Sequence, residues 1–258
     1  MTYSAIIVEQ AVGVAKIRLN RPDQLNALNT TMRAELAHAI SDAAQNARAM
    51  ILTGMGRAFC SGQDLGDAGR LGQISLEQTL TEEYTPLITA LAECPIPTIA
   101  AVNGPAAGGG ANLALAADIC LAARSATFLQ AFAQIGLMPD CGGTYWLPRR
   151  VGMARALGLA MLAEPISADQ AADWGMIWQA LPDGDLQVRA QEIATKMANG
   201  PTAAYARMKS ALRQSLSTDL QEQLALEARL QAELGDSHDF KEGVMAFLEK
   251  RPAEFRGK

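Results

Sequence analysis

The stretch IPTIAAVNGPAAGGGANLALAADICLAA, residues 96–123, contains an apolar run, a glycine-rich turn, a segment of small residues and a second apolar run. Short apolar runs bounded by turn residues are typical of strands buried on both faces of a parallel sheet. The small-residue segment between the two runs predicts a helix. A strand, a helix and a second strand in this order indicate an α/β core.

The same alternation occurs upstream of this stretch. Residues 5–20, AIIVEQAVGVAKIRLN, predict two strands joined around Gly13, and a helix is predicted from about Thr30. Residues 49–54, AMILTG, predict another short buried strand. A second amphipathic helix is indicated by leucines at helical spacing, namely Leu76, Leu80, Leu87 and Leu91.

The downstream part of the chain is expected to be mostly helical. Residues 126–130, ATFLQ, predict a short extended piece, and helices are predicted from about Gly152, interrupted by a strand at residues 176–181, MIWQAL. We therefore predict an α/β core over residues 1–195 and a C-terminal helical region over residues 196–258. Apolar faces in this helical region are expected to pack on a neighbouring subunit.

Composition and charge exclude several classes of function. The net charge of −5 is spread along 258 residues without a basic stripe, which argues against nucleic acid as a partner. No apolar run is long enough to span a bilayer, and the N-terminus does not resemble an export signal, so we expect a cytoplasmic protein that does not bind membranes. The cysteines form no C-x-x-C pair and only two histidines are present, which argues against a metal site.

Two glycine-containing loops follow the apolar strands. These are AFCSGQDL, residues 58–65, and NGPAAGGGANL, residues 103–113. Glycine lets the backbone approach a ligand closely, and the first N–H groups of a helix have no partner within the helix. A carbonyl oxygen between one N–H of each loop would be stabilised as it gained charge. The glycines could instead permit tight packing; a nucleotide site is disfavoured, because Leu113 stands where a third glycine is required.

The stretch IGLMPDCGGTYWLP, residues 135–148, contains a single acidic residue, Asp140. Aspartate before two glycines is common in turns, where its carboxylate accepts hydrogen bonds from the amides of Gly142 or Gly143. Asp140 could instead be the one ionisable group of an apolar site. The local sequence alone favours the turn.

Five stretches in their order along the chain resemble the enoyl-CoA hydratase/isomerase (crotonase) family over essentially the full length. The stretches are LNRPDQLNALN, ILTGMGRAFCSGQDL, AAVNGPAAGGGANLALAADICLAA, GLMPDCGGTYWLPR and DFKEGVMAFLEKRPAEF. The resemblance implies a spiral of ββα units with a C-terminal helical trimerisation region, assembled as a homotrimer or homohexamer. It also implies an acyl-CoA thioester substrate, whose oxygen is held by the backbone N–H groups of Gln63 and Gly109, without a separate cofactor.

The chain departs from the family pattern at the positions of the family's acidic residues. Hydratases of the family carry two glutamates, and these positions fall here on Asn112 and Phe132. Neither residue is a base, so the usual machinery for adding water is missing. Asp140 remains, at the position where several isomerases of the family carry their acid. Apolar neighbours are expected to raise its pKa, and the reading of Asp140 as the catalytic proton shuttle becomes the favoured one.

The resemblance is greatest to the family members that isomerise ring-1,2-epoxyphenylacetyl-CoA in bacterial phenylacetate degradation. The stretches GRAFCSGQDL, GLMPDCGGTYWLPR, DWGMIWQ and the ending FRGK carry it. It implies conversion of the ring epoxide to oxepin-CoA and movement of double bonds from the 3- to the 2-position of enoyl-CoA. The alternatives are an enoyl-CoA hydratase of the fatty-acid type and a catalytically silent acyl-CoA-binding homologue.

Coenzyme A is a long, anionic ligand, so Arg57, Lys250 and Arg251 are candidates for its phosphates; each could equally be a solvated surface charge. The resemblance assigns further residues to the substrate. The residues assigned to the rest of the substrate are Asn26, Ala27, Leu28, Ser61, Gly62, Asp64, Leu65, Gly108, Asn112, Phe132 and Leu137.

Overall fold

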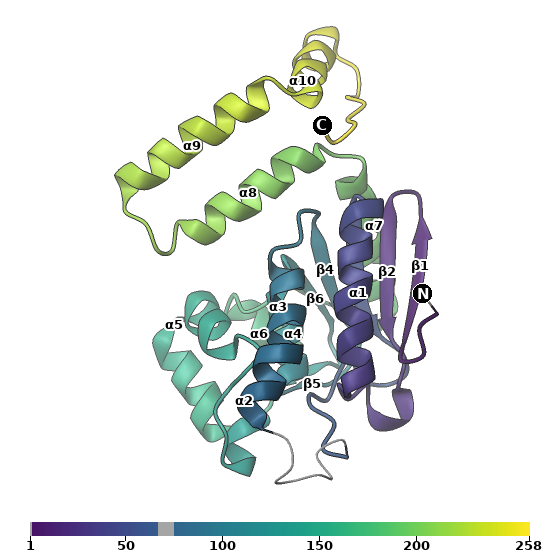
Figure 1. Cartoon of the computed structure of the whole chain (residues 1–258), viewed down its shortest axis with the longest axis vertical. Helices are drawn as coiled ribbons and strands as arrows, with labels where there is room; N and C mark the ends of the chain where they lie inside the picture. Colours follow the sequence, from purple (N-terminus) through teal and green to yellow (C-terminus); the bar gives the residue numbers. More distant parts are fainter. Residues whose placement is uncertain (1, 67–74) are drawn as a thin grey trace.

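The computed structural model describes residues 2–66 and 75–258, which form a mixed α/β core and an extended helical arm (Figure 1). The main sheet has six strands in the order β1-β2-β3-β4-β6-β9. Strands β1 and β2 are antiparallel, whereas the other neighbours are parallel. The strands are β1 (Ile6–Ala11), β2 (Val14–Leu19), β3 (Ala49–Gly54), β4 (Thr98–Val102), β6 (Ile119–Ala123) and β9 (Gln179–Leu181).

The predicted N-terminal hairpin is confirmed. Ala11 pairs with Val14, and the two-residue turn between them has φ angles of 50° at Val12 and 74° at Gly13. Two positive φ angles are typical of the tight turns that match the twist of a hairpin. The predicted strands β3, β4 and β6 are also confirmed, and their side chains are almost all buried.

A small second sheet lies beside the loops that follow the main strands. It contains β5 (Ala106–Ala107), β7 (Thr127–Leu129) and β8 (Ile166–Ser167) in the order β5-β7-β8. Two parallel bridges, Leu28 to Gln63 and Cys60 to Ala106, join the loops to each other and to this sheet. The two glycine-containing loops are therefore held side by side by backbone hydrogen bonds.

The helices of the core surround the main sheet. Helix α1 begins where predicted, with Asn29 as its N-cap: the Asn29 side chain accepts a hydrogen bond of 2.9 Å from the Met32 amide. Helix α5 begins at Gly143, so the expected helical start near Gly152 was wrong; Gly152 instead kinks this helix with a φ of 77°. The core helices are α1 (Thr30–Asn46), α2 (Leu76–Thr79), α3 (Thr85–Ala92), α4 (Gly109–Ala116), α5 (Gly143–Leu162), α6 (Ala168–Asp173) and α7 (Leu186–Ala198).

The predicted amphipathic helix through Leu76 and Leu91 exists but is not regular. Helices α2 and α3 are joined by a π-helical turn, η3 (Leu80–Tyr84). Such turns are rare inside helices and are frequent at functional sites. The core also contains short 3₁₀ segments, namely η1 (Pro22–Gln24), η4 (Ala131–Ile135) and η5 (Asp183–Asp185).

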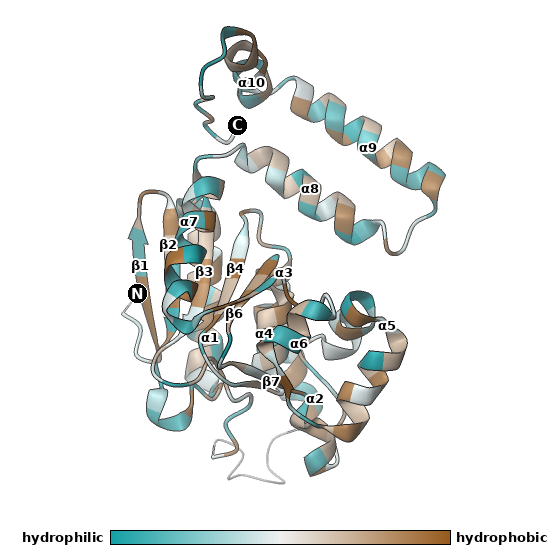
Figure 2. Cartoon of the chain, turned by 180° about the vertical axis from the view of Figure 1, so that it is seen from behind, coloured by the Kyte–Doolittle hydropathy of each residue, from teal (hydrophilic) through white to brown (hydrophobic). Residues whose placement is uncertain are grey.

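The C-terminal helices α8 (Thr202–Gln214), α9 (Leu220–Gly235) and α10 (His238–Glu249) extend away from the core (Figure 1). Asp118 ties α8 to the core, because its carboxylate contacts Lys209 at 2.7 Å and Arg213 at 2.9 Å. Figure 2 shows apolar residues interspersed along α8 and α9. Helix α7 continues across the predicted boundary at residue 195. The division of the chain into two parts at that point stays a prediction.

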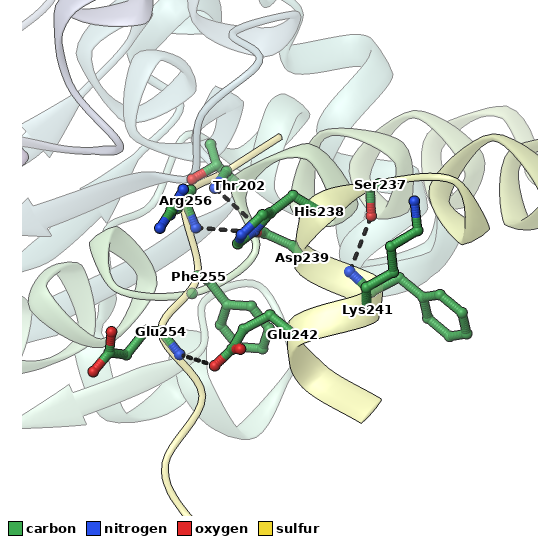
Figure 3. Close-up of polar contacts among 12 residues, drawn as sticks. Thr202, Ser237, His238, Asp239, Lys241, Glu242, Glu254, Phe255 and Arg256 are labelled. Carbon is green, nitrogen blue, oxygen red and sulfur yellow. Dashed lines mark hydrogen bonds and ion pairs between the residues drawn. The ribbon is translucent and has the colours of Figure 1, made fainter. Parts of the chain in front are cut away.

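The last residues of the chain are held against α10 and the core. The carboxylate of Asp239 accepts hydrogen bonds of 2.7 Å from the amides of Arg256 and Gly257 (Figure 3). From the core, Arg48 donates to the main-chain oxygens of Gly200 and Phe255. The tail therefore links the base of the helical arm to the core.

None of the helices in the described ranges combines the length and apolarity needed to span a membrane.

Candidate active site

A cavity of about 470 Å³ lies between the α2–α3 segment and the loop that precedes α5. Gln63, Tyr84 and Asp140 line it, and Asp140 is its one carboxylate among the described residues. The apolar residues of its wall include Leu76, Leu80, Ile88, Leu137, Met138 and Pro139. A cavity of this kind, largely apolar with a few polar groups, is typical of a small-molecule site.

Backbone from both glycine-containing loops meets beside this cavity. Gly62 has a φ of 94°, and a Cβ at Gly62 would lie 2.9 Å from the Ala107 oxygen and 3.3 Å from the Gly109 nitrogen. Only glycine therefore allows the loops to approach so closely. Within the described residues, the amides of Gln63 and Gly109 have no hydrogen-bond acceptor. Two free donors are thus available at this point.

Gly109 is the first residue of α4, where the positive end of the helix dipole lies. Every residue of α4 is buried, so this positive end is not screened by bulk water. A Cβ at Gly109 would lie 3.6 Å from Oδ1 of Asp140 and 3.0 Å from Sγ of Cys141. The structure therefore brings the predicted residues Gln63, Gly109 and Asp140 together.

The Asp140 carboxyl group is not a turn cap. Its Oδ1 atom is buried and has no hydrogen-bond partner among the described residues, whereas the Gly143 amide donates to the main-chain oxygen of Asp140 at 2.8 Å. Helix α5 has Gly142 as its N-cap, without a capping side chain. Neither the Gly142 amide nor the Gly143 amide donates to the carboxylate, so the turn-cap alternative was wrong. An unpartnered buried carboxyl oxygen is unusual and marks a candidate functional group.

Burial raises the pKa of Asp140, and the neighbouring Cys141 thiol opposes the rise only in part. Burial also raises the pKa of Cys141 and of Tyr84 above their ordinary values, so that both stay protonated near neutral pH. Desolvation disfavours the charged form of each group. Asp140 is consequently the group of this cluster that can exchange a proton at moderate pH.

Asn112 and Phe132 are both buried outside the cavity lining. The Asn112 side chain is fully buried and bonds to Gln130 and to the main-chain oxygen of Asp140. The ring of Phe132 packs behind the loop, and a Cβ at Gly108 would lie 3.7 Å from its Cζ. Their assignment as residues that contact substrate stays a prediction.

The segment before α1 lies against the Gln63 loop. The Leu28 amide donates to the Gly62 oxygen at 2.7 Å, and the Ser61 amide donates to the Leu25 oxygen at 3.0 Å. Asn26 is fully buried, and its side chain donates to the main-chain oxygens of Met55 and Ala58. These contacts place the predicted binding residue Leu28 beside Gly62 and Ser61 beside Leu25, with Asn26 packed against residues 55–58.

Other predicted binding residues differ in their exposure. Asp64 contacts Arg21 at 2.7 Å and accepts from the Gly66 amide, which fixes the loop. Leu65 is exposed at the surface, whereas Leu137 is half-exposed and lines the cavity. The guanidinium of Arg251 is paired with Glu242 and Glu249, so this candidate phosphate ligand already has partners within its own helical region.

Tyr84 and Arg33 are residues of the site region that sequence reasoning missed. Tyr84 is buried and lines the cavity from η3, and its hydroxyl accepts a hydrogen bond of 3.4 Å from Arg33. Arg33 also donates to the Leu28 oxygen at 2.6 Å and pairs with Glu83. Tyr84 shares the helical spacing of Leu80, Leu87 and Leu91, which was the available signal.

Comparison with known proteins agrees with this architecture. The sequence profile described as enoyl-CoA hydratase/isomerase matches residues 9–258. A Rhodobacter capsulatus protein named probable enoyl-CoA hydratase is 58% identical over 258 residues, covering 100% of both chains. The 1,2-epoxyphenylacetyl-CoA isomerase of Escherichia coli is 47% identical, covering 95% of this chain and 96% of that protein.

The fold is likewise shared with solved structures. An enoyl-CoA hydratase from Polaromonas sp. JS666 superposes with a TM-score of 0.93 and 32% identity, covering 98% of this chain and 100% of that chain. The predicted crotonase-like α/β core with a C-terminal helical region is thereby confirmed.

Proposed function

We propose that this chain, which belongs to the enoyl-CoA hydratase/isomerase family, is an isomerase of acyl-CoA thioesters that works through one carboxylate. The observation that carries the proposal is the buried, unpartnered Oδ1 of Asp140 beside the start of α4. An isomerisation conserves the composition of its substrate. One base can therefore remove a proton and return it to another carbon.

The backbone donors supply the first half of the chemistry. The thioester oxygen binds between the amides of Gln63 and Gly109, whose hydrogens have no acceptor among the described residues. The enolate that forms when a proton leaves the neighbouring carbon is stabilised there. Loss of one such donor costs about 3–4 kcal/mol of barrier in comparable sites.

Asp140 supplies the second half. For a 3-enoyl-CoA, the ionised carboxylate takes a proton from carbon 2, and the C3–C4 double bond moves to C2–C3 as carbon 4 receives that proton. Because burial raises its pKa, Asp140 holds the proton between the two steps more readily than an exposed aspartate would. Such proton transfer contributes about 10²–10⁴-fold in rate.

We further propose that the physiological substrate is ring-1,2-epoxyphenylacetyl-CoA, which is converted to oxepin-CoA. The name and the 47% identity of the Escherichia coli relative support this assignment. The apolar cavity wall suits a ring substrate, since Leu80, Ile88 and Leu137 offer no hydrogen bond to it.

Enoyl-CoA hydration is the second candidate, because the 58% identical Rhodobacter capsulatus protein is named a probable hydratase. The site disfavours it. Addition of water needs a group that activates water in addition to one that delivers a proton, and Asp140 is the one carboxylate that lines the cavity in the described part of the chain.

A panel of thioesters distinguishes these candidates. Purified protein should convert 3-hexenoyl-CoA to 2-hexenoyl-CoA, and it should hydrate crotonyl-CoA only slowly, as followed by absorbance and mass spectrometry. Rapid hydration of crotonyl-CoA with no double-bond shift would refute the isomerase. Binding of acyl-CoA without either reaction would leave a silent homologue.

A homotrimer or homohexamer is the proposed assembly, formed through the helical arm. Large apolar side chains are exposed there, including Leu212, Leu220, Phe247 and Leu248. A surface of this kind is typical of protein–protein contacts. Phe247→Asp should shift the molecular mass measured by light scattering from that of a trimer or hexamer to that of a monomer; an unchanged mass would exclude this face.

The remaining expectations stay predictions. We propose that no separate cofactor is used, because coenzyme A enters as part of the substrate. A cytoplasmic location is supported by the four buried, unpaired thiols, namely Cys60, Cys94, Cys120 and Cys141.

A further inference from the structure

The main chain of Asp140 is held firmly, although its carboxyl oxygen Oδ1 is free. The Asp140 carbonyl accepts one hydrogen bond from the Gly143 amide and one from Nδ2 of Asn112, each 2.8 Å long. Since a carbonyl only accepts, the Asn112 side chain must face it with its NH₂ group. The orientation of the Asn112 carboxamide is thereby set.

A second carboxamide completes this arrangement. Nε2 of Gln130 donates to Oδ1 of Asn112 at 2.9 Å, and Nδ2 of Asn112 donates to Oε1 of Gln130 at 3.3 Å. Asn112 is fully buried and Gln130 is 4% exposed. Buried amides that satisfy each other in this way are rigid, because any rotation would leave a polar group unpaired.

We propose that Asn112 and Gln130 are positioning residues that hold the Asp140 peptide, and thereby aim its free carboxyl oxygen at the substrate beside Gly109. This inference rests on the proposed function, because a fixed direction of the Asp140 oxygen serves the reaction only if that oxygen transfers the proton. Three separate segments take part: α4 carries Asn112, Gln130 follows β7, and Asp140 precedes α5. Neither amide needs to contact the substrate.

The proposal requires an amide at position 112. In Asn112→Asp, an ionised carboxylate would face the Asp140 carbonyl with an acceptor, and the hydrogen bond would be lost. The introduced carboxyl group could still donate when it is protonated, so the defect should depend on pH. The titratable or charged groups around this point are Asp140, Cys141, Tyr84, Cys60 and Arg33. Burial raises the pKa of Cys141, Tyr84 and Cys60, which stay neutral near neutral pH.

Steady-state kinetics of Asn112→Asp against pH, with 3-hexenoyl-CoA, tests the proposal. We expect kcat of the unaltered protein to rise with pH to a plateau as Asp140 ionises. In the variant kcat should fall again on the alkaline side, by about 100-fold, with KM unchanged. A kcat that keeps the unaltered profile, or a loss that is equal at every pH, would overturn the positioning role.

Asn103→Asp is the matched control. Asn103 also fixes a loop, since its side chain accepts from the Gly54 amide at 2.9 Å and donates to the Gly56 oxygen at 3.1 Å. It does not contact Asp140. Asn103→Asp should lower stability without changing the pH profile of kcat. If kcat of this variant also fell on the alkaline side, the fall would report a general loss of structure, and the proposal would be overturned.

If Asn112→Asp does not fold, Gln130→Glu tests the positioning role in its place. An ionised carboxylate at position 130 still accepts from Asn112 but cannot donate to it, so kcat should fall less than in Asn112→Asp, again with KM unchanged. An unaltered kcat would overturn the proposal. Asp140→Asn distinguishes failure of the proposed function from failure of the positioning role. If Asp140→Asn retains the normal rate, the proposed function is wrong. If Asp140→Asn is inactive while Asn112→Asp behaves like the unaltered protein, the positioning role alone is wrong.

Discussion

Asp239, at the start of α10, and Asp140, at the cavity, both have buried carboxyl oxygens, but their surroundings differ. Asp239 is 4% exposed, and its two oxygens each accept a main-chain hydrogen bond of 2.7 Å from the C-terminal tail (Figure 3). Oδ1 of Asp140 has no partner among the described residues. In the first region both carboxyl oxygens are occupied by hydrogen bonds of the fold, and in the second region one carboxyl oxygen is left available.

This difference separates a structural acid from a reactive one. A carboxylate that accepts backbone hydrogen bonds stabilises the folded chain, whereas a buried oxygen without a partner destabilises it. Proteins keep such unsatisfied groups where they serve a reaction. We therefore expect replacement of aspartate by asparagine to have opposite effects on stability at the two positions.

The largest expected effect is on catalysis. Asp140→Asn should lower kcat for 3-enoyl-CoA isomerisation by about 10²–10⁴-fold, because the proton acceptor is removed. Binding of the acyl-CoA, measured by calorimetry, should remain. Asp239→Asn serves as the comparison and should keep its kcat; a similar loss at both positions would contradict the distinction.

The next effect is on stability at the tail. Asp239→Asn should lower the free energy of unfolding by about 1.5–3 kcal/mol, since a neutral amide accepts less strongly and with only one oxygen. Denaturant unfolding measures this change. A variant that unfolds at the same denaturant concentration would show that the tail contacts contribute little.

Gly143→Ala tests the packing behind Asp140. A Cβ there would lie 2.4 Å from Nδ2 of Asn112, so the side chain that holds the Asp140 carbonyl must move. We expect a loss of about 1–3 kcal/mol in stability together with a lower kcat. Gly158→Ala in α5 is the control, because a Cβ there meets no atom within 4 Å, and it should be neutral or slightly stabilising.

The smallest effect is the stabilisation expected for Asp140→Asn, about 1 kcal/mol near neutral pH. The folded-state pKa of Asp140 is raised, so ionisation costs stability as pH rises from the unfolded pKa through the folded one. The gain should therefore be present near neutral pH and vanish in acid. Thermal unfolding at several pH values measures it; a gain that persists in acid would mean that the charge is not its cause.

Much of the fold could be predicted from local patterns. The hairpin around Gly13 and the buried strands at residues 49–54 and 96–102 follow from apolar runs and turn residues, which act over a few neighbours. The start of α5 was missed because Gly142 and Gly143 suggest a loop and Pro148 suggests a break. Packing against the core overrides these local preferences.

The sequence by itself determined that a glycine-containing loop follows each of two apolar strands, and that Asp140 is the sole acid in its stretch. Only the tertiary structure decided which groups of these loops stay free. The bonds from Asn112 to Gln130 and to Asp140 join residues that are 18 and 28 positions apart. Hydrogen bonds of this kind form only when folding brings the segments together, so no local pattern could show that the Asp140 peptide is held while its carboxyl oxygen is not.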